Sequence, residues 1–297
     1  MLRFLPGPIK GILSMLLISL NTLLICLPLF SIALLKLLLP IQAVRRFFNR
    51  ILDGLATTWI SINNGIHSLT KKIRWQVEGL ESLKRDDWYL VLSNHQSWAD
   101  ILVLQKIFNR RIPFMKFFLK QELIWVPVIG LGWWALDFPF MKRYSKSYLA
   151  KHPEMKGKDM ETTRKACEKF RTMPVSIMNF VEGTRFTPAK AKHTQSPFKH
   201  LLKPKAGGAG FVLTAMGEQL HRILDVTIVY PQKAHSFWDF LCGKVTDIRV
   251  HVRSLPVTKD LVGNYEDDKE YRVRFQSWLN ELWLEKDQRI GHMLARS

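Results

Sequence analysis

The sequence predicts an α/β fold, in which a mixed sheet is flanked by helices and preceded by a membrane-associated helical segment. Beyond Lys71, short β-like apolar runs alternate with helical patterns, as is typical of α/β domains. Residues 11–35 contain no charged side chain, whereas the rest of the chain contains nearly all of the charge. Hydrophobic residues make up 47% of the 297 residues, which excludes a disordered or collagen-like chain. We therefore divide the chain into a helical membrane segment at residues 1–70 and a folded domain at residues 71–297.

The uncharged run at residues 11–35 is long enough to cross a membrane. As a helix it would extend about 37 Å, more than the roughly 30 Å of a hydrocarbon core. A cleaved signal peptide has a shorter apolar part of roughly 7 to 15 residues, and no A-x-A cleavage site follows this run. Because Pro28 removes a backbone donor, the run is one kinked span, two helices that meet at Pro28, or a re-entrant hairpin.

Basic residues around this run indicate its orientation. Arg3 and Lys10 precede the run, and four basic residues follow it: Lys36, Arg45, Arg46 and Arg50. Because Lys and Arg are retained on the cytoplasmic side, this count favours a cytoplasmic C-terminal domain if the run spans.

A second, amphipathic helix is predicted over residues 41–69. Apolar residues recur there at alternating steps of three and four, and arginines and polar residues lie between them. Such a helix either packs its apolar stripe on the domain core or lies at an anionic bilayer surface with Trp59 at headgroup level. The two interpretations are compatible.

The remaining elements follow from short apolar runs and their breaks. We predict strands at residues 88–93, 112–116, 135–140, 174–181, 224–230 and 245–252. We predict helices at residues 98–108, 117–132, 160–171, 206–220 and 267–288. Residues 143–160 and 185–200 are rich in Pro, Gly, Lys and Ser, which predicts surface loops.

Charge and cysteine content restrict the partners and the compartment. The 44 Lys and Arg exceed the 25 Asp and Glu, giving a net charge of +19 that favours anionic lipids and phosphates. The three cysteines are widely spaced and form no C-x-x-C pair, which fits a reducing compartment without a disulfide scaffold.

The first chemical motif runs from Asn94 to Asp100, between an apolar strand and an amphipathic helix. His95 is suited to act as a general base because its pKa lies near neutrality. A carboxylate that accepts from one ring nitrogen leaves the other free to take a proton, and Asp100 can fold back to do so. Without a second cluster, the same residues would be explained equally well as a helix-capping loop.

The second motif, Glu182-Gly183-Thr184-Arg185, follows another apolar strand in the same way. Gly183 allows close backbone approach, Thr184 supplies a hydroxyl and Arg185 supplies a fork for phosphate oxygens. An ordinary β-turn with solvated charges is the alternative. Because the ends of adjacent strands build one crevice in an α/β sheet, we expect the two motifs to form one site.

These motifs resemble those of the glycerolipid acyltransferases of the lysophosphatidic acid acyltransferase type, also called 1-acylglycerol-3-phosphate O-acyltransferases. His95-x4-Asp100 is similar to their first motif, and residues 180–185 are similar to their phosphate-binding motif. Weaker blocks at residues 138–143 and 226–231 agree in order. The likeness is to a bacterial inner-membrane branch, with some similarity to the eukaryotic lysocardiolipin acyltransferase-like branch. It makes residues 71–297 the catalytic domain.

The resemblance implies transfer of a fatty acyl chain from acyl-CoA or acyl-ACP to the sn-2 hydroxyl of lysophosphatidic acid, giving phosphatidic acid. His95 would be the general base and Asp100 would orient it. The acceptor would be bound by six residues: Arg143, Glu182, Gly183, Thr184, Arg185 and Lys203. No bound cofactor and no metal are implied, and the enzyme would work at the cytoplasmic face of a bacterial inner membrane, against anionic lipid.

Two alternatives stay open. Val181 stands where the family commonly has Pro, which leaves room for another acceptor such as lysophosphatidylglycerol or lysocardiolipin. A different class would be a membrane-tethered basic protein that binds nucleic acid or acts as an adaptor. Lys and Arg are spread along the chain without a nucleic-acid module pattern, so we expect no nucleic-acid partner.

Overall fold

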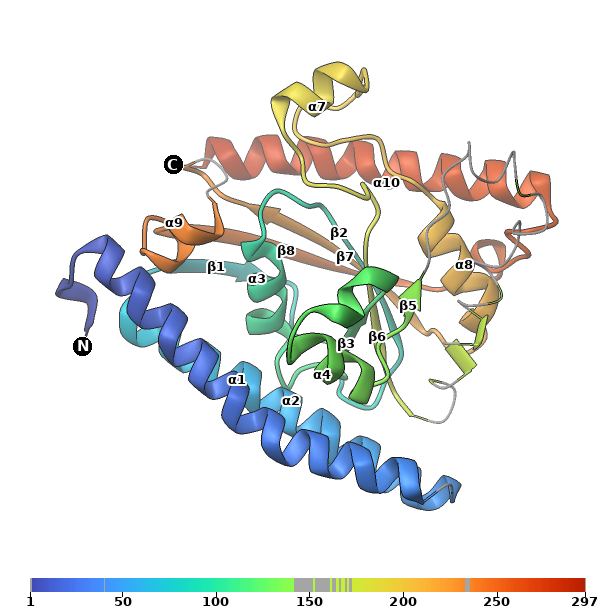
Figure 1. Ribbon diagram of the computed structural model, residues 1–297. Helices are drawn as coiled ribbons and strands as arrows, with labels where there is room; N and C mark the ends of the chain where they lie inside the picture. The colour runs from blue at the N-terminus through green and yellow to red at the C-terminus, as the bar shows by residue number, and fades with distance from the viewer. Residues whose placement is uncertain are drawn as a thin grey trace.

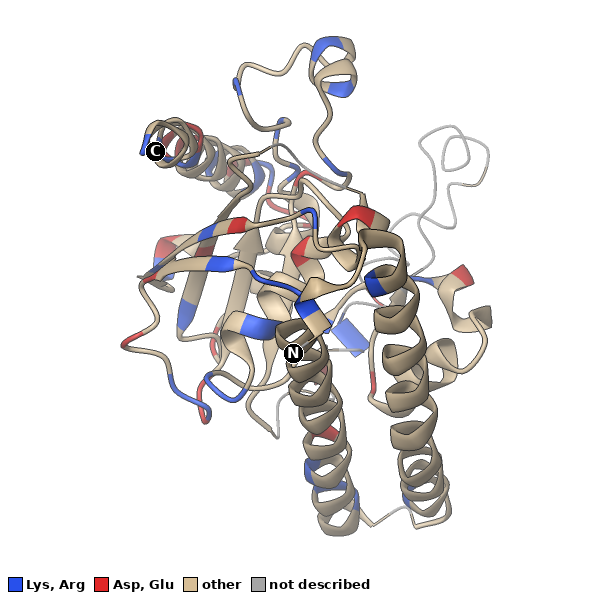
Figure 2. Ribbon diagram, turned by 90° about the vertical axis from the view of Figure 1, so that its left-hand side faces the viewer, with Lys and Arg blue, Asp and Glu red and all other residues tan. Residues whose placement is uncertain are grey.

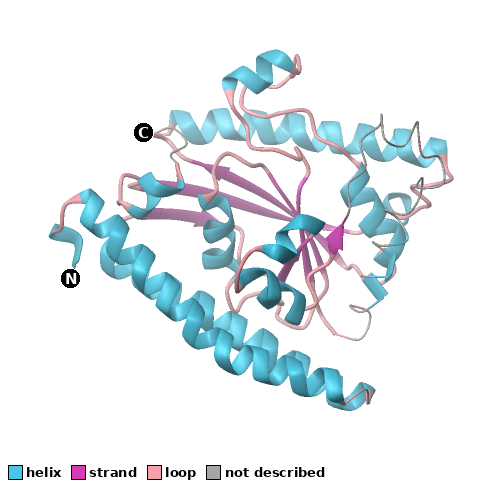
Figure 3. Cartoon of the chain, viewed as in Figure 1, coloured by secondary structure: helices cyan, strands magenta, loops and turns pink. Residues whose placement is uncertain are grey.

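The structure is a computed structural model, and its central feature is a six-stranded sheet (Figures 1 and 3). It describes residues 2–39, 41–141, 152, 161, 164, 165, 167, 168, 170, 173–232 and 236–296. The strands are β1 (Arg74–Glu78), β2 (Tyr89–Ser93), β3 (Met115–Phe117), β6 (Ser176–Phe180), β7 (Arg222–Val229) and β8 (Asp247–Pro256). Their spatial order is β1-β8-β7-β2-β6-β3. Strands β7, β2, β6 and β3 are mutually parallel, and β8 with β1 runs the opposite way, so the sheet is mixed as predicted.

Helices cover both faces of this sheet (Figure 1). Alternate residues of β2 point to opposite faces, so Leu90 and Leu92 join a cluster with α8 (Gly207–Met216) and α10 (Lys269–Ala295). Tyr89 and Val91 join a second cluster with α3 (Ala99–Phe108) and α9 (Phe237–Leu241). Because every residue of β2 is buried, this strand lies in the middle of a three-layer core.

The N-terminal segment is a hairpin of two long helices, α1 (Gly7–Leu38) and α2 (Gln42–Thr70), which lie side by side (Figure 1). Helix α1 is continuous through Pro28, so the uncharged run is one helix rather than two meeting there. It is long and apolar enough to cross a membrane. Figure 2 shows the hairpin projecting beyond the sheet with few charged residues along its length.

Helix α2 confirms the predicted amphipathic helix, and its buried stripe packs on α1 and on the domain. Between the helices, Asn21 Nδ2 donates to Asn63 Oδ1 at 2.8 Å. The Trp59 indole N–H donates to Thr22 Oγ1 at 3.0 Å, so the half-buried Trp59 contacts α1. Polar contacts therefore fix the register of the hairpin.

Most predicted elements of the domain are present, and one region is wrong. Residues 117–132, predicted as a helix, contain the end of β3, β4 (Leu119–Lys120), a 3-10 turn (Gln121–Trp125) and the start of α4 (Ile129–Ala135). Pro127 breaks the helical hydrogen-bond ladder there, and Val128 adopts a positive φ of 64°. The predicted strand at 135–140 is mostly absent, because α4 ends at Ala135 and β5 (Phe140–Met141) is all that follows in this part.

Three further differences concern short or exposed elements. Strand 112–116 is displaced to β3, and edge strand β1 was not predicted because only alternate residues of it are half-buried. The predicted loop 185–200 contains a short helix, α7 (Pro188–His193), capped by Thr187. The predicted loop at 143–160 and most of the predicted helix at 160–171 lie outside the described residues.

Candidate active site

The two predicted motifs meet at one edge of the sheet, where parallel neighbours β2 and β6 end. Ser93, the last residue of β2, is paired with Phe180, the last residue of β6. His95 follows the first strand and Glu182 follows the second, and the backbone N–H of His95 donates to Glu182 Oε1 at 3.0 Å. The expected crevice residues are therefore brought together, as the carboxyl ends of adjacent strands require.

His95 and Asp100 form a close pair. His95 Nδ1 lies 2.8 Å from Asp100 Oδ2, and the same oxygen accepts from the backbone N–H groups of Gln96 (2.6 Å) and Ser97 (2.9 Å). Asp100 is fully buried in the first turn of α3, and the His95 side chain is 12% exposed. Because an ionised carboxylate only accepts hydrogen bonds, Nδ1 carries the proton and Nε2 keeps its lone pair. This is the arrangement of an oriented base.

Tyr230 completes this pair and was not predicted as a site residue. Its hydroxyl donates to Asp100 Oδ1 at 2.6 Å, so both carboxylate oxygens have partners. Burial, and then the charge of Asp100, raise the pKa of Tyr230 well above its usual value, which keeps the hydroxyl protonated. Tyr230 directly follows β7, the other neighbour of β2. That position at a third strand end was its signal in the sequence.

The loop that carries His95 is fixed on two sides. Asn94 is buried and pairs with the backbone of Ile228 in β7, donating to its carbonyl at 2.9 Å and accepting from its N–H at 2.8 Å. The His95 ring stacks on Phe180, with centroids 3.9 Å apart and planes at 15°. The imidazole is thus oriented by packing as well as by hydrogen bonds.

Glu182 has a different place from the substrate contact predicted for it. It is 1% exposed, and its two oxygens accept from the backbone N–H groups of His95 (3.0 Å) and Leu202 (2.8 Å). Burial raises its pKa to about 7, against the lowering effect of those two donors. Glu182 therefore ties the His95 loop to the segment at residues 201–202 and holds it in position.

The residues after Glu182 form the turn expected for an anion site. Gly183 has a φ of +71°, which an L side chain rarely adopts, and Thr184 Oγ1 accepts from Lys190 Nζ at 2.7 Å. The Arg185 guanidinium lies over the Trp98 ring, 4.8 Å from its centroid, so it is turned toward the start of α3 and the His95 loop. Lys190 and Trp98 were not predicted here, because their contacts depend on the fold of the turn.

Two other residues, Lys203 and Arg143, were predicted to contact the acyl acceptor. Lys203 is exposed and follows Leu202, whose N–H is bound by Glu182. Arg143 lies outside the described residues. Within the described part of the chain, no group of three His, Cys, Asp or Glu side chains is arranged to hold a metal ion.

A family model described as "Acyltransferase" matches residues 74–231, which is more than half of the chain and includes every residue from His95 to Tyr230 discussed above. The chain belongs to the acyltransferase family. The chain is 26% identical over 212 residues to the 1-acyl-sn-glycerol-3-phosphate acyltransferase delta of Mus musculus, a match that spans 67% of this chain and 51% of the relative. It is 23% identical over 269 residues to lysophosphatidylinositol acyltransferase 10 of Caenorhabditis elegans, across 84% of this chain and 64% of the relative. The chain thus spans between half and two thirds of these relatives' lengths.

A solved structure supports the fold of this acyltransferase. The crystal structure of the 1-acyl-sn-glycerophosphate (LPA) acyltransferase PlsC from Thermotoga maritima superposes with a TM-score of 0.53 at 16% identity. The alignment covers 98% of this chain and 99% of that chain, including the N-terminal helices. The α/β domain and its N-terminal hairpin are therefore a shared architecture.

Proposed function

We propose that this acyltransferase moves a fatty acyl chain from a thioester, acyl-CoA or acyl-ACP, to the sn-2 hydroxyl of lysophosphatidic acid. The observation that carries the proposal is the chain of contacts from Tyr230 through Asp100 to His95, which lies beside the turn that holds Arg185. His95 would act as a base toward the hydroxyl of the acceptor, and Arg185 would bind the phosphate of the same acceptor molecule. A lysophospholipid acceptor needs both.

In this mechanism His95 Nε2 removes the proton of the acceptor hydroxyl as its oxygen attacks the thioester carbonyl. The C–O bond forms, the C–S bond breaks, and the thiol leaves with the proton that His95 returns. Buried Asp100 stabilises the imidazolium that exists between the two proton transfers. Since a thioester is already activated, no acyl-enzyme on a side chain is required.

Arg185 would bind the acceptor phosphate through its planar fork, and Gly183, which has no side chain, would let the phosphate approach the turn. Thr184, Lys203 and Arg143 are proposed as helpers. Binding of the phosphate would position the acceptor hydroxyl beside His95, which lowers the entropic cost of bringing the hydroxyl and the base together. Glu182 contributes by holding the His95 loop.

We propose the cytoplasmic face of a bacterial inner membrane as the site of action, with the apolar helix α1 as the membrane element. The three widely spaced cysteines, which form no C-x-x-C pair, support a reducing compartment on this side of the membrane. Acyl-CoA or acyl-ACP would be a co-substrate, and anionic lipid would be the surface.

A second candidate is the acylation of another lysophospholipid, such as lysophosphatidylglycerol, lysocardiolipin or lysophosphatidylinositol. The relative named for lysophosphatidylinositol supports it, because that match spans more of this chain than the match to the mouse enzyme. Both candidates use the same base and the same phosphate contact.

The test is acyl transfer by the purified protein from acyl-CoA, and in parallel from acyl-ACP, to a panel of these lysophospholipids. We expect the fastest transfer to lysophosphatidic acid, and transfer to any acceptor should stop in His95→Ala. Faster transfer to another acceptor would establish the second candidate. Transfer that survives the loss of His95 would overturn the mechanism.

A further inference from the structure

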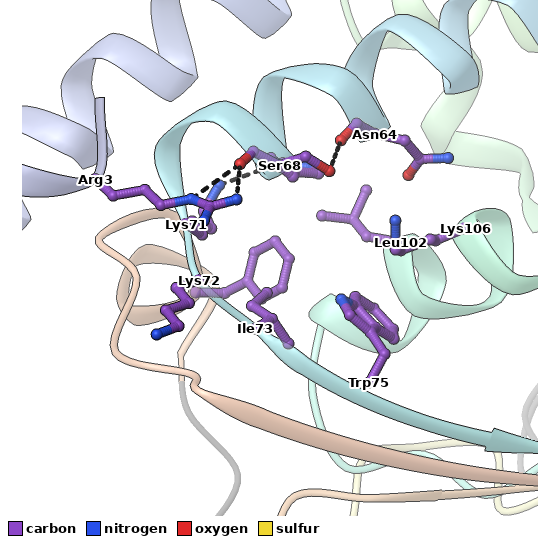
Figure 4. A pocket seen from close by; sticks show the side chains of 11 residues that line it. Arg3, Asn64, Ser68, Lys71, Lys72, Ile73, Trp75, Leu102 and Lys106 are labelled. Atoms are coloured by element: carbon purple, nitrogen blue, oxygen red, sulfur yellow. Dashed lines mark hydrogen bonds between the residues drawn. The ribbon is translucent and has the colours of Figure 1, made fainter. Parts of the chain in front are cut away.

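A cavity that none of the residues of the His95 site lines begins where α2 ends and β1 starts (Figure 4). Its volume is about 220 Å³, the share of roughly seven water molecules in the liquid. Five of its lining side chains are basic or imidazole groups: Arg3, His67, Lys71, Lys72 and Lys106. Trp75 and Phe240 form part of its wall. The cavity is therefore small, cationic and partly aromatic.

The cavity lies toward the same edge of the sheet as the candidate active site. Strand β1 is antiparallel to β2, and its first residue, Arg74, pairs with Asp247 at the start of β8. The start of β8 lies opposite the end of β7, since Val229 pairs with Arg249. Helix α3, which follows the His95 loop, supplies Lys106 to the cavity.

The positive charges here have no acidic partner. Among the described residues, no ion pair includes Arg3, His67, Lys71, Lys72 or Lys106. Lys71 is only 3% exposed, and the partners of its ammonium group are neutral: the hydroxyls of Ser14 and Thr70, the His67 ring nitrogen and the face of the Phe240 ring. Burying a cation without a counter-charge is costly, which indicates that an anion belongs in this place.

His67 supplies an independent observation. It is 8% exposed, and its Nδ1 lies 2.7 Å from Lys71 Nζ. Because an ammonium group only donates, Nδ1 accepts and the ring proton resides on Nε2. His67 Nε2 is buried and has no hydrogen-bond partner. His67, a lining residue of the cavity, thus holds a buried N–H group without a hydrogen-bond acceptor, which is rare in folded proteins.

Arg3 and Lys106, two of the other cations, are held in place beside the cavity. Arg3 donates to the Ser68 carbonyl through Nε (3.3 Å) and Nη2 (2.9 Å), and no described hydrogen bond uses its Nη1 (Figure 4). Lys106 Nζ lies 5.2 Å from the centroid of Trp75. Burial lowers the pKa of Lys71 to about 8 and also lowers that of Lys106, as expected for cations that lack a counter-charge.

We propose that this cavity binds a phosphate group, carried either by a lipid headgroup or by a soluble phosphate ester. Phosphate offers several acceptor oxygens in different directions, which suits donors on α2, on α3 and at the N-terminus. The cavity is large enough for the group together with water. The inference stands apart from the proposed acyl transfer, since none of its residues belongs to the His95 site.

The first test measures binding of inorganic phosphate to the purified full-length protein by calorimetry at constant ionic strength. Lys106→Gln should weaken binding by at least about fivefold, because it removes a charged donor. Lys259→Gln makes the same charge change at an exposed residue outside the cavity and should bind as the unchanged protein does. Arg3→Gln, at an exposed position, is the second variant and guards against a folding effect of Lys106→Gln.

The second test separates the two sources of phosphate with vesicles. Phosphatidylglycerol vesicles carry the group on a lipid, and digalactosyldiacylglycerol vesicles lack it. A lipid site is supported if Lys106→Gln loses more binding to phosphatidylglycerol than Lys259→Gln does, with no such difference on the galactolipid. A soluble-ester site is supported if the variants differ only toward inorganic phosphate or adenosine 3′,5′-bisphosphate.

Equal behaviour of Lys106→Gln, Arg3→Gln and Lys259→Gln toward both probes would overturn the inference. Trp75 adds a local readout, since an anion on Lys106 should change a fluorescence signal that Trp75→Phe removes. His95→Ala should bind phosphate here as the unchanged protein does. A failure of acyl transfer and a failure of this site are thereby told apart.

Discussion

Two His–Asp pairs lie at opposite ends of the same two parallel strands, β2 and β7. Beyond the carboxyl end of β2 are His95 and Asp100, which are 12% and 0% exposed and 2.8 Å apart. At the amino ends are His221, just before β7, and Asp87, just before β2, which are 58% and 16% exposed and 2.5 Å apart. By distance alone the second pair is the better one, so distance does not identify the site.

The surroundings distinguish the two pairs. Asp100 receives hydrogen bonds from two backbone N–H groups and from Tyr230, and the His95 ring is stacked on Phe180. His221 meets Trp88 edge to face at the surface, and Asp87 accepts additionally from the Trp88 backbone. Because the His221 side chain is 58% exposed, its contact with Asp87 contributes little to stability. A His–Asp pair becomes a candidate base when burial and neighbours restrict it to one geometry.

The largest expected difference between the two ends is in turnover. His95→Ala should lower kcat by roughly 100- to 10,000-fold, because it removes the positioned base. His221→Ala should leave kcat near the wild-type value. Steady-state rates and melting temperatures of both purified variants give the comparison. Comparable losses of kcat in the two variants would show that the two His–Asp pairs do not differ in function.

The second largest difference is expected between two arginines, one at the carboxyl ends and one at the amino ends of the parallel strands, in their effect on KM. Arg185→Lys should raise the KM for the acceptor by about tenfold, because a lysine cannot reproduce the bidentate fork. The KM for the acyl donor should change less. Arg222→Lys, at the amino end of β7, serves as the control and should change neither constant. A larger effect of Arg185→Lys on the donor would assign Arg185 to the thioester side.

Two buried tyrosine hydroxyls sharpen the contrast further. Tyr230→Phe removes the donor to Asp100 and should lower kcat by about fivefold, the worth of one hydrogen bond. Tyr89→Phe removes the acceptor of the Lys84 N–H near the amino end of β2 and should affect only the melting temperature. Equal rates for the two variants would show that Tyr230 supports the fold alone.

The smallest expected effect is a pH dependence of stability. The folded pKa of Glu182 is raised to about 7 from an ordinary value of 4.5, so the folded state keeps a proton that the unfolded state loses. The stability linked to Glu182 is present below pH 4.5 and is lost as pH rises toward 7. The melting temperature of wild type should therefore fall over this range relative to that of Glu182→Gln, and parallel melting curves would contradict the burial argument.

The local sequence was sufficient to predict the two motifs. It was insufficient to predict the residues that hold the motif side chains in position. His95 and Asp100 are five residues apart, and residues 182–185 are contiguous, so both patterns can be read beside the strands that precede them. Tyr230 lies 130 residues from Asp100, and its contact depends on β7 lying next to β2. Glu182 was predicted to contact the substrate. Its burial arises from tertiary contacts, so nothing in the sequence indicated that its side chain would be occupied by backbone N–H groups. The helix predicted over residues 117–132 followed apolar periodicity and gave too little weight to Pro127.

Asn94 also holds the His95 loop in position, and it does so through the geometry of the sheet rather than through the reaction. Its carboxamide replaces a peptide group opposite Ile228, adding one rung to the β2–β7 ladder after the backbone has turned away. Aspartate would lack the donor, leucine would lack both groups, and glutamine would be one methylene too long. Any descendant that keeps this turn is therefore expected to keep Asn94, even after the loss of catalysis. Retention of a residue beside a catalytic histidine can thus record the geometry of a sheet rather than the chemistry of a reaction.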